Sequence, residues 1–195
     1  MNKTIRYLVS MAWLLCMVVS ASTQAAEYLI DTKGAHASIN FKIKHLGYSW
    51  LTGRFNQFSG HFTYDEKAPA AMQVKVEIDT ASIDSNHAER DKHLRSADFL
   101  HVDQYPKATF VSTSFQKLKD GKMLLKGDLT LHGVTRTVEI DVTHMGHGAD
   151  PWGGYRRGFS GTVHLVLADF GINYKLGPAS REVFLELQIE GVRQQ

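Results

Sequence analysis

The chain has 195 residues, of which 22 are Lys or Arg and 20 are Asp or Glu, so its formal net charge is +2. It has no basic stripe of the kind that nucleic-acid-binding proteins carry, and we expect no nucleic-acid partner. The only cysteine, Cys16, lies near the amino terminus. A disulfide framework is therefore excluded for the rest of the chain, whose core has to be sufficient without one.

The first 25 residues are organised like an export signal. Lys3 and Arg6 precede a continuous apolar run, and small residues follow up to Ala25. The apolar run is shorter than the roughly 20 residues that span a membrane, which disfavours the alternative of an uncleaved anchor. We predict a signal peptide over 1–25, cleaved near Ala25, and a single exported domain over 26–195 with no integral membrane segment. Loss of Lys3 and Arg6 leaves equal numbers of basic and acidic residues.

Apolar residues recur at every second position through most of the remaining chain. The alternation is clearest over 38–44, 72–79, 123–131, 137–143 and 182–190. One polar and one apolar face is typical of antiparallel strands that are buried on one side. Turn-forming sequences separate these strands at 31–34, 65–69, 119–121 and 132–133. About eight strands, several of them long, predict an all-β protein built as a closed or nearly closed antiparallel β-barrel.

The alternation stops over residues 85–106. Asn86 can cap a helix there, with Glu89 as the partner in a capping box, and we predict one short helix over 87–95. A segment that pairs with no strand has to lie across an end or a seam of the barrel. Two roles remain open for it: a movable lid in which Phe99 contacts the bound ligand, or a permanent plug in which Phe99 is ordinary core.

Three glycines, Gly60, Gly127 and Gly161, lie at positions of the predicted strands whose side chains would point into the barrel. An eight-stranded barrel is either filled by side chains or holds one ligand, and missing side chains favour a cavity, although strand glycines also mark bulges. Apolar walls would suit a long apolar ligand. Arg54, beside aromatic residues, is either a contact for a polar head group or an ordinary surface arginine. The predicted pocket residues are Ile39, Phe41, Ile43, Trp50, Phe55, Phe58, Val74, Val76, Phe99, Phe110, Leu125, Gly127, Leu129, Val138, Ile140, Phe159, Gly161, Val163, Leu185 and Leu187.

Covalent or metal chemistry is the alternative to simple binding. The densest group of candidate metal ligands is His87, Glu89, Asp91, His93 and His101. It contains no His-Glu-x-x-His motif, and no cysteine or Gly-x-Ser-x-Gly motif lies elsewhere in the mature chain. We therefore interpret the group as a solvated helix face and expect no metal, no required cofactor and no catalytic residue. A metal-dependent or lipid-modifying enzyme remains the alternative hypothesis.

Six segments carry a resemblance to a known family: 45–50, 85–100, 105–110, 127–135, 150–154 and 176–180. Together they are similar to the signature of the YceI-like family, and the resemblance covers essentially the whole mature chain. It implies an extended, lipocalin-like antiparallel β-barrel in the bacterial periplasm. It further implies that a polyisoprenoid lipid or an isoprenoid quinone is bound in a long apolar pocket, for transport or sequestration. Two further possibilities stay open: that the protein is a module that binds another protein, and that it forms a homodimer.

Overall fold

The computed structural model describes residues 25–119, 122–175 and 177–195. The predicted signal peptide therefore lies outside the described residues except for Ala25, as do two residues of the turn predicted at 119–121. Within the described ranges no helix is both long and apolar enough to cross a membrane. The strands are β1 (Ala26–Ile30), β2 (Ser38–His45), β3 (Ser49–Phe55), β4 (Phe58–Tyr64), β5 (Gln73–Asp79), β6 (Ile83–Asp84), β7 (Lys107–Lys117), β8 (Met123–Leu131), β9 (Val134–Ala149), β10 (Tyr155–Val166) and β11 (Glu182–Arg193). The helices are α1 (Ala88–Arg95) and the 3-10 turns η1 (Pro69–Ala71), η2 (Thr80–Ser82), η4 (Leu167–Phe170) and η5 (Pro178–Ser180).

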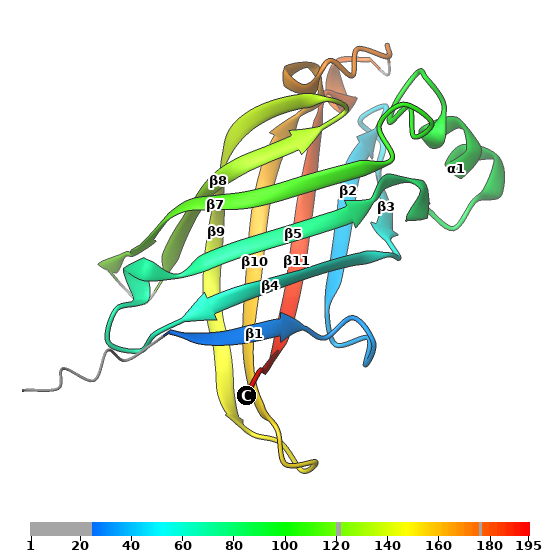
Figure 1. Ribbon diagram of the computed structural model, residues 1–195. Helices are drawn as coiled ribbons and strands as arrows, with labels where there is room; N and C mark the ends of the chain where they lie inside the picture. The colour runs from blue at the N-terminus through cyan, green and yellow to red at the C-terminus, as the bar shows by residue number, and fades with distance from the viewer. Residues whose placement is uncertain (1–24, 120–121, 176) are drawn as a thin grey trace, which may run out of the picture.

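Eight strands close into an antiparallel barrel in the order β1, β4, β5, β7, β8, β9, β10 and β11, and pairing of β11 with β1 completes the circle (Figure 1). The predicted all-β barrel of about eight strands with one short helix is confirmed.

One edge of β11 serves two different strands. Its residues 191–193 pair with β1 and close the barrel, whereas its residues 183–188 pair with β2. From β2 the sheet continues through β3 to the short β6, so the barrel wall extends sideways at one end. Helix α1 lies beside this extension, at the same end of the molecule (Figure 1). We call this the open end, and the opposite end, where β1 meets β11, the closed end.

The strand alternation explains how the barrel acquires an apolar interior. Along β10, Phe159, Val163 and Leu165 are buried, while the intervening Thr162 and His164 are exposed. Successive side chains of a strand point to opposite faces, so this pattern places one apolar face inside the barrel. The two long strands of the β9–β10 hairpin keep this register except for an irregularity between residues 158 and 159.

The cap of helix α1 differs from the prediction. His87 is the N-cap residue, and its Nδ1 accepts a hydrogen bond from the Arg90 backbone N–H at 3.2 Å. Asn86 lies one residue earlier with φ at +62°, in the left-handed conformation that Asn tolerates better than most residues. It therefore forms the turn before the helix instead of capping it. Asp91 accepts hydrogen bonds from the backbone N–H and the hydroxyl of Ser85, which ties the helix to the end of β6.

Candidate ligand-binding site

An apolar hollow of about 500 Å³ lies at the open end. We call it the mouth cavity. Such a volume is within the range of small-molecule binding sites. Its walls come from the barrel, from the β2–β3 extension and from the segment around α1. The lining residues are Ile39, Phe41, Ile43, Lys44, His45, Leu46, Leu51, Phe55, Ile78, Ile83, Arg90, His93, Leu94, Phe99, Leu100, Ala108, Leu129, Leu131, Leu165, Leu167, Ile172, Lys175, Gly177, Ser180, Val183 and Leu185.

A second hollow of about 110 Å³, the deep cavity, lies inside the barrel. Its described walls are apolar; Ser160 borders it, but the Ser160 hydroxyl accepts a hydrogen bond from Gln188 on the outer face. Four residues line both cavities, so the two adjoin: Ile39, Ile78, Leu129 and Leu185. The other residues of the deep cavity are Ile30, Phe62, Met72, Val74, Val76, Phe110, Leu125, Val138, Ile140, Val142, Phe159, Gly161, Val163, Leu187 and Ile189.

Aromatic rings close the deep cavity at its inner end. Phe62 stacks on Tyr28 with ring centroids 4.9 Å apart, and Phe159 meets Phe62 edge-on at 5.5 Å. Inward-facing Arg157 precedes Phe159 on the same face of β10, is only 2% exposed and lines neither cavity. The apolar space therefore ends against rings backed by a charged group.

Arg157 contacts an acidic side chain, an aromatic ring and a histidine. It forms an ion pair with Glu66, its guanidinium lies 4.1 Å from the centre of the Tyr64 ring, and its Nη1 is 3.2 Å from Nε2 of His144. Its Nε has no hydrogen-bond partner among the described residues. Burial, followed by the nearby Arg157 charge, lowers the pKa of His144. Neutral His144 therefore avoids repulsion with the guanidinium.

The predicted pocket residues line one or both cavities, except for Trp50, Phe58 and Gly127. Trp50 lies on the outer face, where its ring meets that of Phe184 at 5.5 Å. On β3 the inward phase contains Leu51 and Phe55, so neighbouring Trp50 has to face outward. Arg54 shares the outward phase, is exposed, and pairs across the sheet with Asp84 instead of lining a cavity.

The three inward-phase glycines differ in what fills the space above them. A Cβ on Gly127 would lie 2.4 Å from the ring of Phe110, so the ring already fills the space that the missing side chain leaves. Gly161 does line the deep cavity, where a Cβ would lie 3.2 Å from Ile140 and 3.3 Å from Leu187. Neighbouring side chains or strands also crowd the space above Gly53, Gly60 and Gly191.

Several lining residues were not predicted. Ile78, Leu131 and Val183 belong to the alternating segments, so their phase was available as a signal. Six further lining residues lie in short or irregular elements where no period can be measured: Leu46, Ile83, Leu94, Leu100, Leu167 and Ile172. Only the pairing of distant strands brings these residues to the mouth cavity.

The predicted metal-ligand group on α1 is dispersed by local contacts. His87 caps the helix, Asp91 binds Ser85, and Nε2 of His93 lies 2.9 Å from Oδ2 of Asp98. In the described part of the chain, one group of three His and carboxylate side chains comes within ligand distance, and it lies elsewhere: Asp31, His36 and Glu190.

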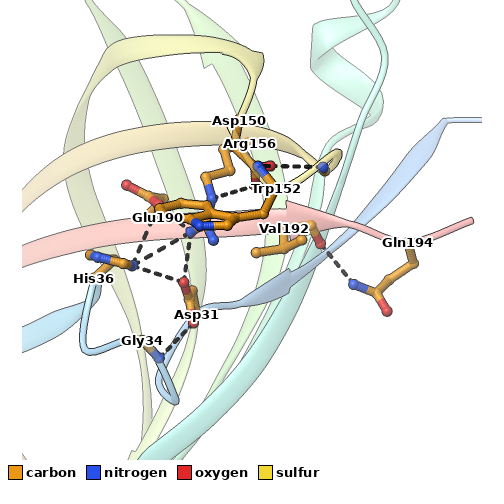
Figure 2. A network of polar contacts seen from close by, with 10 residues as sticks. Asp31, Gly34, His36, Asp150, Trp152, Arg156, Glu190, Val192 and Gln194 are labelled. Carbon is orange, nitrogen blue, oxygen red and sulfur yellow. Dashed lines mark hydrogen bonds and ion pairs between the residues drawn. The ribbon is translucent and has the colours of Figure 1, made fainter.

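This second group is part of a network at the closed end, shown in Figure 2. Arg156 donates hydrogen bonds to Asp31 at 2.6 Å, to Glu190 at 2.5 Å and to Asp150 at 2.8 Å. Nδ1 of His36 lies 2.9 Å from Oδ2 of Asp31. We call these five residues the polar clasp, because they join the loop after β1, the β9–β10 turn and β11.

The guanidinium of Arg156 determines the chemistry of the clasp. The hydrogen bond with His36, followed by that with Arg156, holds the pKa of Asp31 well below its usual range. The three carboxylates raise the pKa of Arg156 in turn. Since Nη1 of Arg156 already bridges Asp31 and Glu190, the clasp is built around an internal cation.

Comparison with known proteins identifies relatives along nearly the whole chain. The chain is 54% identical to the UPF0312 protein of Shewanella sp. (strain W3-18-1) over 177 residues, which are 91% of this chain and 93% of the relative. A UPF0312 protein of Shewanella baltica (strain OS155) is 52% identical over the same share of both chains.

Solved structures share the barrel. The Campylobacter jejuni YCEI protein superposes with a TM-score of 0.69 at 27% identity, over 78% of this chain and 91% of that one. The fold is also that of Burkholderia cenocepacia BcnA, with a TM-score of 0.75 at 24% identity over 83% of this chain and 98% of that one. A polyisoprenoid binding domain from Saccharophagus degradans, implicated in plant cell wall breakdown, has a TM-score of 0.62 at 15% identity over 86% and 98% of the two chains.

The model of the YceI-like domain matches residues 28–191, from β1 to β11. The match therefore includes every strand of the closed barrel and both cavities. With this extent and the identity to the Shewanella relatives, the chain belongs to the YceI-like domain family.

Proposed function

We propose that the protein binds a single polyisoprenoid lipid or isoprenoid quinone, with its tail in the adjoining mouth and deep cavities. The observation that carries this proposal is an apolar path that starts at the open end and stops at aromatic rings. Burial of one five-carbon isoprene unit contributes roughly 3–4 kcal/mol before ordering costs. A long tail therefore supplies tight binding with few polar contacts. The polyisoprenoid-binding description of the Saccharophagus neighbour supports the same ligand class.

The distribution of polar groups orients the ligand. The mouth cavity is lined by His45, Arg90, His93 and Lys175, whereas the described walls of the deep cavity are apolar. A polar head group loses less hydration at the mouth than inside the barrel. We therefore place the tail inward and the head group at the open end, near α1, and not at Arg54.

The proposed biological role is transport or sequestration of this lipid in the periplasm, without catalysis. The export signal in the sequence supports this location. We propose that no metal or other cofactor is required, because Nη1 of Arg156 already lies between Asp31 and Glu190, where it takes the place of a cation. Elemental analysis of untagged protein tests this point: stoichiometric zinc or iron would contradict it.

Mass spectrometry tests the ligand directly. The protein is purified without detergent, and the lipid is extracted and identified; a polyprenyl lipid at about one molecule per chain is the expected result. Titration of the stripped protein with farnesol, a short prenol, then measures binding of the tail in solution. Absence of a prenyl lipid from the extract, together with no farnesol binding, would refute the proposed function.

A further inference from the structure

The open end presents apolar side chains to solvent around the mouth cavity. In the turn between β2 and β3, Leu46 is 57% exposed and Tyr48 is 87% exposed. Tyr174, in the segment that follows η4, is 46% exposed. Leu46 also lines the mouth cavity, so the exposed surface continues directly into the binding site. Clustered exposed apolar side chains of this kind mark an interaction surface.

This surface, the mouth rim, consists of the β2–β3 turn and residues 174–175 and 177–181. The Ser180 hydroxyl donates a hydrogen bond to the carbonyl oxygen of Lys44, which fixes the two parts against each other. Leu46 and Gly47 both have positive φ, at +51° and +87°. This tight backbone turn holds Leu46 at the edge of the cavity and leaves Tyr48 in solvent.

The charge around the mouth rim is positive. Lys44, Arg90 and Lys175 line the mouth cavity, and Arg181 is exposed beside η5. No acidic side chain lines this cavity among the described residues. Nearby Asp98 is paired with His93 on the α1 side. On the outer face next to the rim, the carboxylate of Glu186 is paired with Lys42.

The closed end provides the contrast. Trp152 and Met145 are 76% and 66% exposed there, so exposed apolar side chains alone do not distinguish the two ends. At the closed end the clasp holds three carboxylates to one guanidinium and so keeps a net negative charge, whereas Glu66 is paired with Arg157. A negatively charged partner is therefore favoured at the mouth rim over the clasp.

We propose that the mouth rim is a docking surface for a lipid bilayer that contains anionic lipids, and that the cavity is loaded from this bilayer. Tyr and Trp side chains favour the membrane interface, and Lys and Arg near it are attracted to anionic head groups. Docking in this orientation presents the mouth cavity to the membrane, so that an apolar tail passes into the protein without crossing water. The proposal rests on the proposed function, since it names the surface from which that ligand is taken up.

Vesicle flotation tests the proposal. The mature protein is mixed with vesicles of phosphatidylethanolamine and phosphatidylglycerol, or with vesicles of phosphatidylcholine alone. We expect binding to the anionic vesicles to be at least about tenfold stronger, and to weaken when salt is raised. Equal binding to both vesicle types, or no binding to either, would overturn the proposal.

Two rim variants locate the surface. Tyr48→Ser removes an exposed aromatic side chain of the rim that does not line the mouth cavity. Arg181→Glu reverses a positive charge at an exposed rim residue that does not line the cavity either. Each variant is expected to lose anionic vesicle binding by at least about tenfold. The matched control is Trp152→Ser at the closed end, which should bind vesicles like the wild type.

Farnesol binding in solution separates this proposal from the proposed function. The rim variants are expected to bind farnesol as the wild type does, which also shows that they are folded. Vesicle binding that is unchanged in both rim variants, or lost equally in the control, would refute the docking surface. A wild-type protein that binds farnesol but no vesicle retains the proposed function and loses this inference. A wild-type protein that binds anionic vesicles but not farnesol contradicts the proposed function and supports the docking surface.

Discussion

Arg156 joins three chain segments that are far apart in sequence. Its guanidinium contacts Asp31 after β1, Asp150 in the β9–β10 turn and Glu190 on β11, and its side chain is 22% exposed. These segments meet where β1 and β11 close the barrel (Figure 2). Because the ion pairs are partly shielded from water, they stabilise closure more than ordinary surface pairs would.

Replacement of Arg156 is therefore expected to destabilise the barrel. Arg156→Gln leaves the carboxylates close together without their cation, and we expect the free energy of unfolding to fall by about 2 kcal/mol. Urea denaturation measures the change. Arg136→Gln is the control, because Arg136 is exposed and bonds only to a neighbouring backbone carbonyl. An equal, small effect of both substitutions would show that the clasp is unimportant for stability.

The clasp also predicts how stability depends on pH. The pKa of Asp31 is lowered in the folded protein, so the unfolded chain binds a proton more readily than the folded one. The stabilisation from this carboxylate is complete above roughly pH 5 and is lost as the pH falls below its unfolded pKa. Asp31→Asn should reduce the difference in stability between pH 7 and pH 3, measured by urea denaturation. An unchanged pH dependence would contradict this role of Asp31.

Gly161 provides a test of the deep cavity. Gly161→Leu places a side chain among Ile140, Leu187 and the 110 Å³ space, so long prenyl chains should bind at least about tenfold more weakly while farnesol still binds in the mouth cavity. Affinities for prenols of increasing length measure the effect. Gly161→Ala, with a smaller side chain, is the control and should retain most of the long-chain affinity. Unchanged long-chain binding by Gly161→Leu would exclude the deep cavity from the ligand path.

The limits of sequence reasoning differ from one residue to another. Alternation placed Ile39, Leu129 and Leu185 on the inner face, because the period of a strand is two and one face is buried. It could not show that Phe110 would fill the space above Gly127, because that contact depends on how β7 and β8 pair. The prediction of Trp50 as a pocket residue is wrong, because the phase of Leu51 and Phe55 places Trp50 on the opposite face.

At the scale of elements, the segment between β6 and β7 is a part of the open end that pairs with no strand. Helix α1 is polar, whereas Phe99 and Leu100 after it are buried and line the mouth cavity. Phe99 also meets the rings of His93 at 5.0 Å and Tyr174 at 4.8 Å. The segment therefore covers the cavity through a few apolar contacts, and such segments open more readily than paired strands.

Hydrogen exchange distinguishes a lid from a fixed plug. If residues 86–104 form a lid, their amides should become more protected when lipid binds, because the tail adds contacts to Phe99. The strands β8 and β9 serve as the internal control and should change less. Phe99→Ala should lower the affinity and reduce the protection that lipid provides. High protection of 86–104 that is the same with and without lipid would identify the segment as a plug.

Long elements were predictable from the sequence and short ones were not. β8 and β11 repeat the alternation over enough residues for their period to be measured. The two residues of β6 and the four residues of η4 contain no period, and their positions depend on distant partners. The same is true of the sideways extension through β2 and β3, because nothing local indicates that one edge of β11 pairs with two strands.

At the scale of the whole molecule, the architecture divides the barrel into two functional ends. Closure by β1 and β11 and the clasp seals one end, and the extension through β2, β3 and β6 keeps the other from closing in the same way. The sequence predicted a barrel with an interior ligand, but not this division. The division depends on the register in which β11 pairs with β1 over residues 191–193 and with β2 over residues 183–188.

Binding of a tail should stabilise this whole structure, because the cavities exist only in the folded protein. At a ligand concentration of 100 times Kd, binding to the folded state alone adds about 2.7 kcal/mol to the free energy of unfolding. For a domain of this size, that corresponds to a rise in Tm of roughly 5–10 °C.

Thermal unfolding with prenols of increasing length measures this linkage. At equal concentrations, each added isoprene unit should raise Tm further while it enters the mouth and deep cavities, since each buries more apolar surface. Once both cavities are filled, additional units remain in water and Tm should reach a plateau. In Gly161→Leu the plateau should come at a shorter chain. A benzoquinone head group without a tail is the control, and a Tm rise equal to that of the tailed ligand would show that binding energy comes from the head group and not from the barrel interior.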